Sequence, residues 1–375
     1  MLTNNIVLKS FLRQKSEDKI KYKLQSILKE KNELFKSMSK NYNDNFNFKK
    51  VKNICKKNSI RLIGMGGSIL GSKAIFSFLR EKVKKKFYFI DNLQNIKDRP
   101  KKENFTNLII SKSGNTLETI TNANILIKNN NKNIVITENK MSYLFKLANQ
   151  LKAEMIHHNN FIGGRYSVLS EVGMLPAKLM GLDPGKFRQF DNLIKNKRFL
   201  NILVQNTNSI LSFIKKKKFN SVILNYDPKA HYLFDWYQQL VAESLGKKGK
   251  GILPIISTMP KDNHSVMQLY LDGFKKNFFT FFYFKEKQSI RMNEIIFKQK
   301  IATENVFKFK NIPFRSFEIK QRNEKTLGEL FCYFILETIL LGRALNVNPF
   351  DQPSVELIKK ETNKLFSQRK LQKNI

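Results

Sequence analysis

Three hydroxyl side chains and one ammonium group directly follow an apolar run at residues 107–110. They belong to Ser111, Lys112, Ser113 and Thr116. Such a run is typical of a buried strand, and the residues after it are typical of a helix start. Unpaired backbone N–H groups meet at a helix start, and the helix dipole favours a negative charge there. These side chains could therefore bind an anion such as phosphate; the alternative is that Ser113 or Asn115 only caps the helix.

A second turn of this kind ends the predicted strand at 60–65, in the sequence Gly64-Met-Gly-Gly-Ser68. Glycines let a backbone approach a ligand closely, and Ser68 adds a hydroxyl. The turn lacks the Gly-Lys-Ser/Thr ending of a nucleoside-triphosphate loop, and it does not match the G-x-G-x-x-G fingerprint of dinucleotide binders. Two anion-binding turns on neighbouring strands favour a small phosphate ester bound at the carboxyl edge of a sheet.

Two charged residues could do chemistry beside such a ligand. Arg165 follows two glycines and precedes a predicted helix, so it could stabilise a developing oxyanion. Glu243 lies near the end of the predicted helix 231–245 and could act as a general base, with Gln239 one turn earlier on the same face. The alternatives are an ordinary surface arginine and an exposed glutamate at a helix end.

Three further polar residues stand at the starts of predicted helices. His264 follows a predicted strand, and histidine exchanges protons near neutral pH. The alternative for His264 is a structural residue beside a helix cap. Gln352 and Lys359 lie on either side of the helix start that follows the proline-containing turn at 348–353. By itself, Lys359 is one basic residue among many.

Strands and helices alternate from about residue 59 onward. The expected strands are residues 60–65, 87–91, 108–111, 133–137, 154–158, 221–224, 252–257 and 278–284. The expected helices are residues 70–79, 116–128, 142–151, 167–180, 231–245, 265–271, 326–345 and one that begins at 355. This alternation predicts parallel βαβ units, and we expect an α/β protein with two doubly wound parallel-sheet domains.

The predicted domain organisation has four parts. Residues 1–45 are polar and helix-like, and residues 46–185 form the first α/β domain. Residues 186–219 form a helical connection, and residues 220–375 form the second α/β domain with C-terminal helices.

The charge of the chain is strongly positive, with 68 Lys and Arg against 30 Asp and Glu, a formal charge of +38. One interpretation is nucleic-acid binding through phosphate contacts. The other, which we favour, is a genome rich in A and T, which inflates the use of Lys, Asn, Ile and Phe. The lysine runs at 84–86 and 215–218 lack the interleaved aromatic residues of a base-stacking surface. We therefore expect no specific nucleic-acid partner, although a positive field favours an anionic substrate.

A cytoplasmic protein without membrane contact fits the remaining composition. The start of the sequence lacks the apolar core of a signal peptide. The apolar segment 330–345 is interrupted by Glu337 and Arg343, which favours a core helix over a membrane span. The two cysteines, Cys55 and Cys332, show no paired spacing, so a disulfide framework and a zinc site are both unsupported.

In their order along the chain, these motifs resemble phosphoglucose isomerase. The motifs are Gly-Gly-Ser, Ser-Lys-Ser-Gly-x-Thr-x-Glu-Thr, Gly-Gly-Arg-Tyr-Ser, Gln-x-x-x-Glu-Ser-x-Gly-Lys, a lone His, and Phe-Asp-Gln-x-x-Val-Glu-x-x-Lys. The resemblance extends from about residue 60 to residue 360. It implies two sugar-isomerase (SIS) domains of the flavodoxin-like type. It also implies a glycolytic and gluconeogenic enzyme that interconverts glucose 6-phosphate and fructose 6-phosphate through a cis-enediolate.

The resemblance implies a role for each residue singled out above. The sugar phosphate would be held by Ser111, Lys112, Ser113 and Thr116. Further substrate contacts would come from Gly67, Ser68, Gln239 and Gln352. Glu243 would move the proton between C2 and C1, and Arg165 would stabilise the enediolate. His264, donated by the partner subunit of a homodimer, and Lys359 would assist ring opening. No cofactor or metal is implied.

Three positions depart from the pattern of the family. Ile69 stands where Asp is common, Glu171 where a small residue is usual, and Ser354 where Gly is usual. Two other functions stay open at this point. One is a dual phosphoglucose/phosphomannose isomerase, because small pocket differences decide epimer tolerance. The other is a non-catalytic sugar-phosphate-binding regulator, which the presence of Glu243, His264 and Lys359 disfavours.

Overall fold

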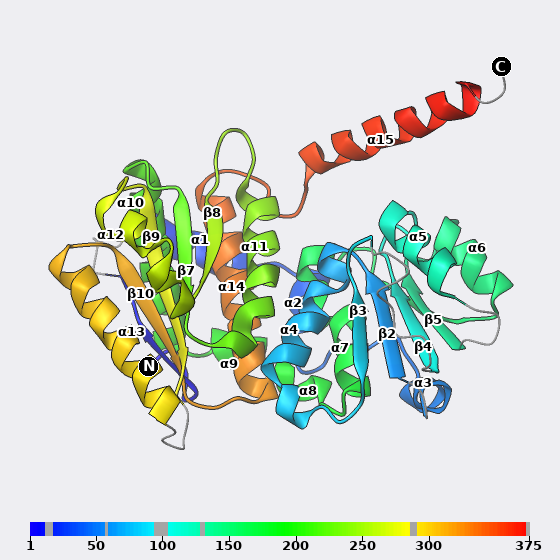
Figure 1. Ribbon diagram of the computed structural model, residues 1–375, viewed down its shortest axis with the longest axis horizontal. Helices are drawn as coiled ribbons and strands as arrows, with labels where there is room; N and C mark the ends of the chain where they lie inside the picture. The colour runs from blue at the N-terminus through cyan, green and yellow to red at the C-terminus, as the bar shows by residue number, and fades with distance from the viewer. Residues whose placement is uncertain (12–17, 57–58, 94–103, 128–131, 286–290, 373–375) are drawn as a thin grey trace.

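The computed structural model describes residues 1–11, 18–56, 59–93, 104–127, 132–285 and 291–372, and these residues contain two five-stranded β-sheets. The sheets lie in opposite halves of the molecule, with α4 (Leu70–Phe78), α11 (His231–Leu245) and α14 (Glu324–Ala344) between them (Figure 1). The α/β class predicted from the sequence is confirmed.

The first sheet has the strand order β3-β2-β4-β5-β6, and all its strands are parallel. Its strands are β2 (Ser59–Gly64), β3 (Phe87–Ile90), β4 (Phe105–Ile110), β5 (Lys132–Thr137) and β6 (Glu154–His157). Its other helices are α5 (Leu117–Leu126) and α6 (Tyr143–Gln150). The order is that of the flavodoxin-like type. The sequence predicts each of these elements to within a few residues; position 128 of one expected helix lies outside the described residues.

The second sheet has the order β1-β10-β9-β7-β8. Four of its strands are parallel: β7 (Asn220–Asn225), β8 (Leu253–Thr258), β9 (Asn277–Phe284) and β10 (Phe314–Ile319). The helices α12 (Met267–Asp272) and α13 (Arg291–Phe309) belong to this half. Both α13 and β10 lie in a stretch for which the sequence pattern predicts no element.

The N-terminal segment differs from the expected helix-like extension. Residues 6–9 form β1 (Ile6–Lys9), which pairs antiparallel with β10 at the edge of the second sheet. Ile6 and Leu8 are buried there, because alternate residues of a strand face the same side. Helices do follow, at α1 (Asp18–Lys29), α2 (Glu33–Met38) and α3 (Phe48–Ile54). Part of the expected extension, residues 12–17, lies outside the described residues, and the domain boundaries stay a prediction.

Helices lie along the chain between the two sheets, and those after residue 186 fall where the sequence predicts a helical connection. They are α7 (Glu171–Leu179), α8 (Pro184–Phe187), α9 (Phe190–Ile194) and α10 (Lys197–Lys215). The helix expected at 167–180 begins instead as a 3₁₀ turn over Gly164–Leu169 and passes through an extended Ser170 before α7.

One hydrophobic core reaches into both halves. It joins Leu62 of the first sheet to Phe278 of the second through α14, which is buried along nearly its whole length. The predicted core helix at 326–345 is thereby confirmed, and no helix among the described residues is long and apolar enough to cross a membrane. The last helix, α15 (Pro353–Gln372), projects away from both sheets (Figure 1).

Candidate functional site

The two turns that the sequence predicts to bind an anion lie at one point of the first sheet. Strands β2 and β4 are neighbours in this sheet. After β2 the chain continues to β3 on one side of this pair, and after β4 it continues to β5 on the other side. The last residues of these two strands, Gly64 and Ile110, are paired neighbours. Ligands of open parallel sheets bind at such a switch point, outside the carboxyl ends of the strands. The structure thus brings the two turns together at the place where a small ligand would bind.

The hydroxyl-rich turn is ordered by its own side chains. The Oγ of Ser111 and the Oγ1 of Thr116 are 2.9 Å apart, and Ser111 is buried. Ser113 is exposed, and its Oγ accepts a hydrogen bond from the backbone N–H of Asn115 at 3.2 Å. This contact lies before α5, whose N-cap is Thr116 without a side-chain cap hydrogen bond, so the capping alternative for Ser113 and Asn115 is wrong. The Ser113 side chain is open to solvent.

Lys112 is held by two acceptors beside that turn. Its ammonium group donates to the carbonyl of Asn160 at 2.8 Å and lies 3.6 Å from the carboxylate of Glu138. Burial lowers the pKa of Lys112, and the charge of Glu138 opposes that shift. Glu138 is buried and was not singled out from the sequence, where it is one acidic residue among thirty.

The glycine-rich turn packs against the segment that carries Arg165. A β-carbon on Gly67 would lie 2.2 Å from the carbonyl carbon of Gly164, and one on Gly66 would lie 2.7 Å from the Nε2 of Gln239. Gly66 also has a φ of +52°, which favours glycine. These glycines therefore permit a close approach of protein to protein, in addition to any approach of a ligand. Ser68 is half-buried at the end of this turn.

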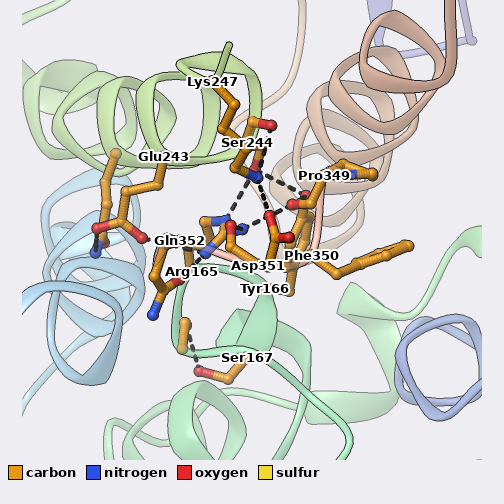
Figure 2. A network of polar contacts seen from close by, with 12 residues as sticks. Arg165, Tyr166, Ser167, Glu243, Ser244, Lys247, Pro349, Phe350, Asp351 and Gln352 are labelled. Atoms are coloured by element: carbon orange, nitrogen blue, oxygen red, sulfur yellow. Dashed lines mark hydrogen bonds and ion pairs between the residues drawn. The ribbon is translucent and has the colours of Figure 1, made fainter. Parts of the chain in front are cut away.

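Arg165 is a buried cation whose guanidinium group is saturated with acceptors (Figure 2). Its Nε donates to the hydroxyl of Ser244 at 2.8 Å. Its Nη2 donates to the backbone carbonyls of Pro349 and Asp351 at 2.7 and 3.0 Å. Its Nη1 faces two side chains, those of Glu243 and Gln352. The surface-arginine alternative is therefore wrong.

Glu243 lies between two donors near the C-terminal end of α11. Its Oε2 is 3.2 Å from the Nη1 of Arg165, and its Oε1 accepts a hydrogen bond from the Nε2 of Gln239 at 2.9 Å. The Glu243 side chain keeps 26% exposure. A carboxylate that is oriented on one side and open on the other can take a proton from a bound molecule. The sequence-predicted residues Arg165, Gln239, Glu243 and Gln352 form one network.

Sequence reasoning missed three residues of this network. The hydroxyl of Tyr166 is 2.8 Å from that of Ser244 and donates to the carbonyl of Pro349, and burial raises the pKa of Tyr166. Lys247 pairs with Asp351 at 2.8 Å, and this contact lowers the pKa of Asp351. Ser244, Tyr166 and Lys247 all stand inside the motifs quoted above, next to the residues that were chosen.

Two predicted residues do not join the network within this chain. His264 is exposed in the 3₁₀ turn Lys261–His264. Lys359 is exposed on the projecting helix α15, where it pairs with Glu356 at 2.6 Å.

The three residues that depart from the family pattern lie in different surroundings. Ile69 is buried in the hydrophobic core. Glu171 is buried as well, and it accepts hydrogen bonds from the backbone N–H of Asn159 at 2.8 Å and from the hydroxyl of Tyr42 at 3.2 Å. Ser354 is exposed at the start of α15. None of these residues touches the carboxylate of Glu243 in the described contacts.

Comparison with known proteins gives the class and then the family. Among solved structures, the glucose-6-phosphate isomerase of Chlamydia trachomatis has the same fold, with a TM-score of 0.77 at 15% identity over 98% of this chain and 89% of that one. The glucose-6-phosphate isomerase of Methanocaldococcus jannaschii is 33% identical over 357 residues, covering 86% of this chain and 88% of that protein. That of Mycoplasmopsis pulmonis is 29% identical over 373 residues, covering 84% and 85%. The pattern of the phosphoglucose isomerase family matches residues 2–253. This chain belongs to the phosphoglucose isomerase family.

Proposed function

We propose that this protein interconverts glucose 6-phosphate and fructose 6-phosphate, a step of glycolysis and gluconeogenesis. One observation carries the proposal. The carboxylate of Glu243, which is 26% exposed, is oriented by Arg165 and Gln239, and Gln239 packs against the glycine-rich turn at the switch point. This arrangement supplies a base and an anchor for a phosphorylated substrate.

The chemistry needs a base at C2 of the sugar and a stabiliser for the enediolate that forms. Glu243 takes the C2 proton and returns it to C1, and Arg165 provides the positive charge. Each N–H group of Arg165 already has an acceptor, so a substrate oxygen reaches Nη1 only by replacing Gln352 or by sharing the hydrogen with it. Gln352 is therefore the side chain that competes with a substrate oxygen for Nη1 of Arg165.

The phosphate group anchors the substrate away from the reacting carbons. It is held by the hydroxyl-rich turn, that is by Ser111, Lys112, Ser113 and Thr116. Gly67 and Ser68 line the neighbouring turn. Binding energy from this remote group orients C2 toward the carboxylate, so phosphate contacts raise the rate as well as the affinity.

We assign ring opening to His264 and Lys359 in a homodimer, with His264 donated by one subunit to the site of the other. Both residues are exposed in the single chain, which leaves them available to a second subunit. The two cysteines are unpaired and buried, which fits a reducing cytoplasm.

The decisive assay supplies fructose 6-phosphate and follows glucose 6-phosphate with an NADP-dependent dehydrogenase. We expect turnover, and a folded protein without turnover would refute the proposal. Mannose 6-phosphate serves as the second substrate, and turnover of it would extend the activity to a dual isomerase.

A mixing experiment tests the exchange of His264 between subunits. Glu243→Gln and His264→Gln should each be inactive as homodimers. Refolding them together should restore about a quarter of the normal activity, since half of the dimers are mixed and each mixed dimer has one intact site. If His264 served the site of its own chain, the mixture would stay inactive.

A further inference from the structure

The second sheet has its own switch point, at the opposite end of α11 from Glu243. The chain leaves β7 toward β8 on one side and leaves β9 toward β10 on the other. A cavity of about 920 Å³ opens at this edge of the second sheet. Tyr226 and Phe284, at the ends of β7 and β9, line it. Small ligands of parallel sheets bind at such a point.

Three cations line this cavity, and they differ in how they are held. Arg322 has only 9% of its side chain exposed; its guanidinium lies 4.0 Å from the ring centre of Phe284 and 3.0 Å from the carboxylate of Asp227. Lys229 contacts Glu81, a carboxylate that is itself 73% exposed. In the described part of the chain, Lys320 has no carboxylate within ion-pair distance. One cation is thus fixed, one is paired with an exchangeable partner, and the third, Lys320, places its ammonium group 3.8 Å from the sulfur of Met1.

The opposite wall of the cavity is apolar. It comes from the first turns of α13, where Met292 and Ile296 face the cavity and Met292 is 63% exposed. Asn293 and Gln321 add amide groups. A ligand that fits these walls has a dianionic end for the cations and an uncharged body for the side chains of α13.

We propose that this cavity binds a small phosphate monoester, with its phosphate among Lys229, Lys320 and Arg322. The site is separate from the isomerase site. Glu243 follows His231 along α11 by a distance of about 18 Å at the rise of an α-helix. The cavity also borders both halves of the molecule, since Glu81 belongs to the first half and Lys229 to the second. A bound phosphate competes with Glu81 for Lys229. The inference goes beyond the proposed function and does not depend on it.

Adenosine 5′-monophosphate is a suitable probe, because it carries one phosphate monoester on a flat, uncharged ring system. Titration calorimetry at physiological salt would compare the full chain with two double variants. Lys229→Gln with Lys320→Gln changes the cavity. Lys310→Gln with Lys325→Gln removes the same charge from exposed lysines outside it. Adenosine, which lacks the phosphate, is the matched ligand control.

We expect saturable binding of the monophosphate to the unaltered chain and to the Lys310/Lys325 variant. The Lys229/Lys320 variant should bind at least about 10-fold more weakly, the loss that a missing charge-assisted contact produces. Equal binding by both double variants would overturn the proposal, because the ligand would then be at the Ser111 turn or attracted by overall charge. Absence of saturable binding to the unaltered chain, or equal binding of adenosine, would also overturn it. If the double variant does not fold, Lys320→Gln alone applies the same test without breaking the contact between Lys229 and Glu81.

None of these measurements uses turnover. A failed binding experiment therefore leaves the isomerase assay untouched, and a failed assay leaves the binding result untouched. If both succeed, adding the monophosphate to the assay shows whether the two sites communicate. A change in kcat in the unaltered chain that is absent in the Lys229/Lys320 variant is the expected sign of communication.

Discussion

The Nη1 atom of Arg165 lies 3.2 Å from the Oε2 atom of Glu243, and the two residues come from different halves of the chain. Arg165 has 1% of its side chain exposed and Glu243 has 26%. The guanidinium group of Arg165 is therefore fixed by the protein. The carboxylate of Glu243 contacts that group and stays partly exposed to solvent. This asymmetry suits a site in which the base must reach a substrate and the stabilising charge must stay in place.

Glu243→Gln tests the base. The amide keeps the size of the side chain but cannot accept a proton, so kcat should fall by about 100- to 10,000-fold while substrate affinity changes little. The coupled assay measures kcat, and inhibition by a non-isomerisable sugar phosphate measures binding. Glu294→Gln, at an exposed position on α13 where the carboxylate pairs with Lys298, is the control. Near-normal turnover by Glu243→Gln would remove Glu243 from the role of base.

Arg165→Lys tests the buried network. A lysine cannot satisfy the carbonyls of Pro349 and Asp351 together with the hydroxyl of Ser244, so the free energy of unfolding should fall by about 3 kcal/mol. Urea denaturation measures the change. The same substitution at Arg343, whose side chain is 41% exposed and paired with Glu30, should cost less than about 1 kcal/mol. Similar losses at both positions would show that Arg165 has no special place in the stability of the fold.

Gly67→Ala tests the contact between the glycine-rich turn and the Arg165 segment. The new methyl group would lie within 2.5 Å of three backbone atoms of Gly164 and Arg165, so we expect a loss of about 1–3 kcal/mol and a large loss of kcat. Gly164→Ala is the matched control, since no atom lies within 4 Å of a β-carbon there. If both variants behave alike, the close approach at Gly67 is unimportant.

His158 makes the stability of the fold depend on pH. Burial lowers its pKa to about 4, from an ordinary value near 6.5. Below pH 6.5 the unfolded chain takes up a proton that folded His158 refuses, so stability falls as the pH drops from 6.5 toward 4. Lys112 and His157 favour the neutral ring, whereas Glu138 and the backbone carbonyl of Asn159 favour the charged one.

The variant His158→Gln should remove this dependence, which amounts to at most about 1.4 kcal/mol per pH unit. Urea denaturation at several pH values between 4.5 and 6.5 measures it. Buried Glu171, whose pKa is raised by burial, acts in the opposite direction, because the folded state then binds the extra proton. His157→Gln is the control, because His157 is exposed and directly precedes His158 in the sequence. If the free energy of unfolding of His158→Gln depends on pH as it does in the unaltered chain, the pH dependence comes from other groups.

Local patterns explain which parts of the fold could be predicted. The strand-turn-helix units of the first sheet have apolar runs and capping residues within a few positions, so their elements and both anion-binding turns are visible in sequence. Strand β1 is different, because it is four residues long and its partner β10 is over three hundred positions away. No local pattern marks such a pairing.

In the candidate site, too, some residues are marked by local sequence and others are revealed only by the folded chain. Arg165 and Glu243 could be found because each stands beside glycines in a motif. The backbone carbonyls of Pro349 and Asp351 that hold Arg165 have no side-chain signature, and only the folded chain reveals them. His264 and Lys359 are exposed and do not contact Glu243 in the described part of this chain, so their roles stay a prediction.

The pairing of Ile6 with Ile319 has a consequence for synthesis on the ribosome. The first strand of the chain leaves the ribosome long before its partner exists. At ordinary elongation rates the delay is about 15–60 s, which is much longer than a small unit needs to collapse. During that time the apolar side of β1 has no sheet edge to join. The order of translation therefore makes the N-terminal strand wait for β10 before it can join the second sheet.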